Sequence, residues 1–78
     1  MNDQQTLEQL RETGPKWAAG RADIALALWE QYEGGGVDEF DFQDNMRRLV
    51  ADDELDGYDD IETRHTLVTA VLGLAGEI

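Results

Sequence analysis

Glycine and proline divide the chain into segments, and these breaks constrain the fold more than any other sequence feature. Gly14 and Pro15 stand together, and three consecutive glycines occupy positions 34–36. Proline suits the first position of a helix and glycine suits the residue that follows its last turn, so each break separates two helices. The breaks predict one helix over residues 3–12 and a second over residues 15–33.

The rest of the sequence predicts two more helices. One spans residues 38–51, and the other begins at Asp59 or Asp60, because either side chain can accept the hydrogen bond of an N-cap. We expect the first helix to be capped in the same way by Asp3 or Thr6.

Apolar residues recur with helical spacing in every segment. The first helix offers Leu7 and Leu10. The apolar side of the second helix is expected to contain Trp17, Ala18, Ile24, Ala25, Leu28, Trp29 and Tyr32. That of the third is expected to contain Phe42, Met46, Leu49 and Val50, and that of the fourth Ile61, Leu67, Val68, Val71, Leu72, Leu74 and Ala75. Because no alternating strand pattern occurs, we predict a single acidic helical domain over residues 1–78, an all-α compact small bundle of three main helices plus a short N-terminal helix.

The composition excludes several classes of function. The chain has no cysteine, no serine and a single histidine, His65, which excludes disulfides, thiolate zinc sites and serine or cysteine triads. Neither a membrane-spanning run nor a secretory signal occurs. We therefore expect a cytoplasmic protein that is not an enzyme, holds no cofactor and no metal, and does not enter a membrane.

The net charge of −12 predicts the chemistry of the partner. Residues 30–62 hold 13 acids and only two bases, Arg47 and Arg48, so nearly all the net charge lies in this part of the chain. Such a charge excludes direct binding of nucleic acid and favours a basic protein surface as partner. A homodimer is a further alternative.

The stretch DDELDGYDDIE, residues 52–62, holds seven carboxylates in eleven positions and partly matches a calcium-binding EF-hand loop. With Gly57 at the sharp turn, the first three ligand positions are Asp52, Glu54 and Asp56. The match fails at its end, where Thr63 replaces the glutamate that supplies two oxygens. A degenerate calcium-binding helix-loop-helix stays an alternative, beside an acidic loop that needs no ion.

The single histidine and two arginines lie beside or within the apolar sides of their helices. His65 borders the apolar side of the fourth helix and forms a Glu-x-x-His spacing with Glu62, a pattern that di-iron bundles use twice. A single copy favours a half-buried packing role for His65. Arg21 and Arg64 fall within the apolar sides of their helices. We expect their stems to cover the edge of the core, with an interface role as the alternative.

Phe40 lies away from the apolar side of its helix and follows Asp38 and Glu39. Two interpretations fit this position equally. The ring could pack against the core at the helix start, or it could be exposed among carboxylates as an anchor for a basic partner with an apolar pocket.

In size, acidity and helical class the chain resembles small phage-encoded inhibitors of the anti-CRISPR and anti-restriction type. These inhibitors share no residue motif, so no functional residue is transferred from them. The resemblance implies a protein of the bacterial host cytoplasm that binds a basic surface of a nucleic-acid-handling complex and blocks it, as a nucleic-acid mimic does. An acidic structural or assembly adaptor is the alternative. The charge pattern predicts a partner-binding surface made of Asp38, Glu39, Phe40, Asp41, Asp44, Asp52, Asp53, Glu54, Asp56 and Asp59.

Overall fold

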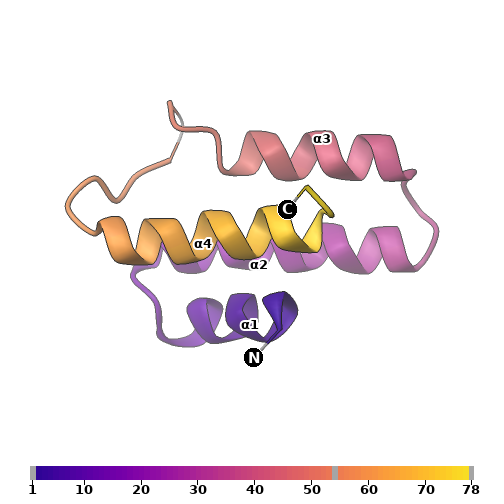
Figure 1. Ribbon diagram of the computed structural model, residues 1–78. Helices are drawn as coiled ribbons and strands as arrows, with labels where there is room; N and C mark the ends of the chain where they lie inside the picture. The colour runs from indigo at the N-terminus through magenta and orange to yellow at the C-terminus, as the bar shows by residue number, and fades with distance from the viewer. Residues whose placement is uncertain (1, 54, 78) are drawn as a thin grey trace.

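The computed structural model, described for residues 2–53 and 55–77, is a bundle of four helices (Figure 1). They are α1 (Asp3–Thr13), α2 (Lys16–Glu33), α3 (Glu39–Leu49) and α4 (Ile61–Leu74). Helices α2 and α4 lie side by side in the middle, with α1 packed on one side of the pair and α3 on the other. No strand occurs in the described ranges. The all-α prediction is confirmed, although α1 is no shorter than α3, since each has 11 residues.

The direction of the helices decides which loops share an end of the molecule. Helices α2 and α4 begin at the same end, and α3, which lies between them in the sequence, runs in the opposite direction (Figure 1). The turn from α2 to α3 uses a positive φ of 78° at Gly35, a conformation that glycine adopts without strain. The longer connection from α3 to α4, residues 50–60, lies at the other end, beside the start of α2. We call these residues the acidic loop.

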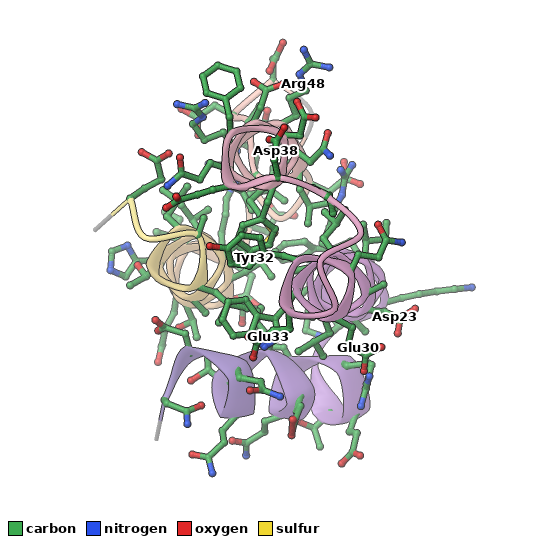
Figure 2. All side chains as sticks on the ribbon, turned by 90° about the vertical axis from the view of Figure 1, so that its right-hand side faces the viewer. Asp23, Glu30, Tyr32, Glu33, Asp38 and Arg48 are labelled. Carbon is green, nitrogen blue, oxygen red and sulfur yellow. The ribbon has the colours of Figure 1, made fainter. Side chains whose placement is uncertain are left out.

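The core is built from one apolar side of each helix and from an aromatic cluster between α2 and α3. Phe42 is 1% exposed, and its ring stacks on Tyr32 with 4.5 Å between centroids. Trp29 lies 6.0 Å from both rings. Tyr32 points into the space between α2, α3 and α4 (Figure 2). Such packing of large rings stabilises a small bundle because each buries a large apolar area.

Two isoleucines predicted to be in the core are exposed instead. The buried side of α2 consists of Ala18, Ala22, Ala25 and Leu26. Ile24 lies off this side and is 49% exposed. Alanines face the neighbours because α2 contacts all three other helices, and small side chains permit close approach. Ile61 is 75% exposed because it is the first residue of α4, whose buried residues begin only at Leu67.

Two helices have an aspartate as their N-cap, and for α4 it is one of the two residues predicted. Asp38 accepts a hydrogen bond from the backbone of Asp41 at 2.8 Å, and Asp60 accepts one from Thr63 at 3.1 Å. The prediction for α1 is wrong. Its cap is Asn2, which forms a reciprocal capping box with Gln5.

Candidate functional site

The acidic loop is fixed to the bundle by an apolar side chain in its middle. Leu55 is 1% exposed and belongs to the core, although its neighbours Asp53 and Asp56 are exposed. A chain that buries one leucine between carboxylates must turn those carboxylates outward, since burying them unpaired costs several kcal/mol. The loop therefore has one inner side and one outer, charged side.

Arg64 of α4 binds the loop backbone. Its Nη2 donates to the carbonyl of Asp52 at 3.1 Å and to that of Leu55 at 3.3 Å, while Nη1 lies 3.5 Å from the Asp52 carboxylate. The guanidinium carbon lies 4.9 Å from the centre of the Tyr58 ring, and the Tyr58 hydroxyl donates to the same Asp52 carbonyl at 3.2 Å. The Arg64 guanidinium thus binds the loop, and the Arg64 side chain is only 19% exposed.

Gly57 lets the loop contact the start of α2. Its φ is 91°, and a Cβ at this position would overlap the Trp17 ring. Only glycine meets both conditions, because other residues favour negative φ and carry the Cβ that the indole excludes. The turn glycine of the EF-hand comparison is thus explained by packing.

The loop carboxylates differ in what they contact. Asp52 pairs with Arg64, and Asp60 caps α4. Thr63 lowers the pKa of Asp60 by hydrogen bonds from its side chain and, to a lesser extent, from its backbone N–H. Asp53, Asp56 and Asp59 are exposed and take part in no ion pair within residues 2–53 and 55–77. Among the described residues of the loop, these three carboxylates carry the uncompensated charge.

The arrangement does not reproduce an EF-hand in the part of the chain that the structure describes. There, no three acidic or histidine side chains converge as ligands for a metal ion. Asp52, an expected ligand, pairs with Arg64, and Asp60, which falls on the water-mediated position of an EF-hand loop, caps α4. Glu54, a third, lies outside the described residues.

The other predicted partner-binding residues lie at the opposite end of α3. Asp38, Glu39, Phe40 and Asp41 stand at its start, whereas the acidic loop follows its last turn (Figure 1). The two groups are separated by the length of α3, about 16 Å for 11 residues. The single negative region expected from the sequence is therefore divided in two.

Between the two groups, arginines offset part of the charge. Asp44 is half-buried, and its carboxylate lies 3.9 Å from the Arg47 guanidinium and 3.2 Å from that of Arg48, four residues further along the helix. Arg47 also approaches Glu77 at 3.5 Å. Figure 2 looks at the end where α3 begins and shows Asp38 there, with Arg48 on the outer side of α3.

Phe40 and His65 lie at the surface. Phe40 is 73% exposed, so the interpretation that its ring packs on the core is wrong. His65 is exposed as well, so the half-buried packing role predicted for it is also wrong. Arg21 behaves as expected of a side chain at the core edge, since its Nη1 donates to the carbonyl of Leu49 at 3.2 Å.

A hollow of about 450 Å³ opens beside the acidic loop, lined by Asp52, Tyr58, Ile61, Arg64, His65 and Val68. Two of its members, Tyr58 at 69% and Ile61 at 75%, are among the most exposed large apolar side chains in the described ranges. The sequence did not predict this hollow. The one sequence feature that points to the hollow is Arg64, a charged residue within the apolar side of its helix.

Within the described ranges, no helix combines the length and the apolar character needed to cross a membrane. The chain matches no protein family model, no curated protein and no solved structure.

Proposed function

We propose that this protein is a non-catalytic inhibitor that binds a basic surface of a nucleic-acid-handling protein or complex through the acidic loop, and blocks that surface as a nucleic-acid mimic does. One observation carries the proposal. Asp53, Asp56 and Asp59 are exposed and unpaired in the described ranges, on a loop that Arg64, Leu55 and Gly57 fix to the bundle.

The fixed loop favours binding because little order has to be gained on association. Ordering a flexible loop at an interface opposes binding, and side chains add about 0.5–1.5 kcal/mol each when they are immobilised. Here the carbonyls of Asp52 and Leu55 are held before a partner arrives, because Arg64 donates to both and the Tyr58 hydroxyl donates to that of Asp52. The carboxylates are presented in a defined arrangement, as phosphates are on a nucleic-acid backbone.

The charge favours a partner that ordinarily holds nucleic acid. A net charge of −12 on 78 residues attracts basic surfaces over a Debye length and accelerates encounter with them. Lysine and arginine grooves that neutralise phosphates are the most strongly basic surfaces of this kind, and carboxylates compete for the same side chains. Blocking of such a groove would follow from occupancy alone, which needs no catalytic group.

The proposal is tested by reversing the three unpaired charges together, Asp53→Lys, Asp56→Lys and Asp59→Lys. Asp52 is left unchanged because its carboxylate pairs with Arg64. A matched control, Asp23→Lys, Glu30→Lys and Glu33→Lys, changes the net charge equally at exposed positions of α2 that lie further along the helix than Trp17, where the loop contacts it (Figure 2). Circular dichroism checks that both variants keep their helices.

The readout is affinity capture from a bacterial lysate, with elution by duplex DNA and identification by mass spectrometry. We expect the wild-type protein and the control variant to retain the same nucleic-acid-binding proteins, duplex DNA to release them, and the loop variant to retain none of them. Retention by the loop variant equal to that of wild type would refute the role of the loop. Captured proteins that DNA does not release would instead support an acidic assembly adaptor.

A further inference from the structure

The hollow beside the acidic loop combines apolar surface with surrounding carboxylates. Tyr58, Ile61 and Val68 supply its apolar lining, and His65 lies at its edge. Ile61 occupies the first position of α4, where no helix or cap requirement calls for a β-branched apolar residue. The fold gives no reason for this exposed side chain, whose burial against a partner would remove apolar area from water.

The charges around the hollow select what can enter it. Asp59 and Asp60 lie between Tyr58 and Ile61 in the chain, and Glu62 follows, while Asp52 is part of the lining. The one arginine there, Arg64, already contacts Asp52 and the loop carbonyls and does not repel a cation as a free guanidinium would. A partner segment with lysine or arginine next to its apolar side chain therefore meets charges of opposite sign, whereas a segment with aspartate or glutamate there is repelled.

We propose that the hollow takes one large apolar side chain from a basic protein segment, with lysine or arginine residues on both sides of it contacting the loop carboxylates. The inference rests on the proposed function, since it assumes a basic partner, and it adds a requirement that charge alone does not impose. A second copy of this chain is disfavoured as the occupant because two chains of charge −12 repel each other.

A pair of peptides separates the apolar requirement from the charge requirement. One is a short helical peptide with a central leucine flanked by lysines, and the other is the same peptide with serine in place of leucine. Binding is followed by amide chemical shifts of the labelled protein and by titration calorimetry at low and high salt. We expect the leucine peptide to bind more tightly and to shift the amides of His65 and Val68.

Ile61→Ser tests the hollow, and Phe40→Ser is its matched control. The two residues are similarly exposed, at 75% and 73%, and Phe40 lies at the other end of α3. We expect Ile61→Ser to weaken binding of the leucine peptide about tenfold, as truncation of a central apolar anchor does, and to leave the serine peptide unaffected. We expect Phe40→Ser to change neither.

The possible failures are distinguishable. Equal, salt-sensitive affinity for both peptides, or an unchanged affinity of Ile61→Ser, would overturn the role of the hollow and leave the charge-dependent binding of the proposed function in place. Binding to neither peptide, or binding indifferent to salt, would refute the hollow and count against the proposed function as well. Concentration-dependent dimerisation that Ile61→Ser abolishes would assign the hollow to a second copy and overturn the proposal.

Discussion

Substitution of Gly57 by alanine should destabilise the protein through two separate effects. The residue has a φ of 91°, in the region that L side chains rarely adopt, which costs about 1–2 kcal/mol. The added Cβ would also overlap the Trp17 ring, and overpacking of this kind costs about 1–3 kcal/mol. We expect a total loss of about 2–5 kcal/mol.

Such a loss is large for this chain. A domain of 78 residues has a free energy of unfolding of about 4–12 kcal/mol, and each kcal/mol moves the melting temperature by about 4–8 °C at this size. Urea unfolding followed by circular dichroism measures the loss directly. We expect the midpoint to fall while the helical signal of the folded state is kept.

Two other glycines serve as matched controls. Gly35 has a φ of 78° with open space around its Cβ position, so Gly35→Ala reports the backbone cost alone, about 1–2 kcal/mol. Gly20 lies within α2 with open space and no positive φ, so Gly20→Ala should stabilise the protein by up to about 1 kcal/mol. If Gly57→Ala costs no more than Gly35→Ala, the contact with Trp17 does not confine the loop, and only Arg64 and Leu55 are left to fix it.

Two further predictions concern the ends of the acidic loop. Arg64→Met removes both hydrogen bonds to the loop carbonyls and should cost about 1–3 kcal/mol, with faster amide hydrogen exchange in residues 55–58; unchanged exchange would contradict the role of Arg64. The pKa of Asp60 is lower in the folded state than the ordinary value of 3.8, so its cap stabilises the fold above that pH and the contribution is lost as the pH falls through the folded-state pKa. Unfolding of wild type and Asp60→Ala should therefore differ at neutral pH and converge in strong acid, and a difference that is constant with pH would count against the cap.

The helices could be predicted from the sequence because their limits are set by local chemistry. Pro15 and the glycines at 34–36 define α2 almost to the residue, and Asp60 caps α4 as expected. The cap of α1 is not apparent from single residues, because Asn2 and Gln5 cap the helix as a reciprocal pair.

The candidate site was less predictable because its parts come from different helices. Helical spacing placed Ile24 and Ile61 in the core, but spacing cannot tell where neighbouring helices end or which side they cover. The charge count likewise assigned Asp41 and Asp53 to one region, although Asp41 lies in the first turn of α3 and Asp53 in the loop that follows its last turn. The contact of Trp17 with Gly57 joins residues far apart in the chain, and neither residue alone indicates it.

The two tryptophans occupy different surroundings on a single helix. Trp17 lies under the acidic loop against Gly57, and Trp29, twelve residues further along α2, lies in the aromatic cluster with Tyr32 and Phe42. A rise of 1.5 Å per residue puts the two positions about 18 Å apart. The protein therefore carries two built-in fluorophores. In a Trp29→Phe variant the remaining indole emission reports the state of the loop, and in a Trp17→Phe variant it reports the core.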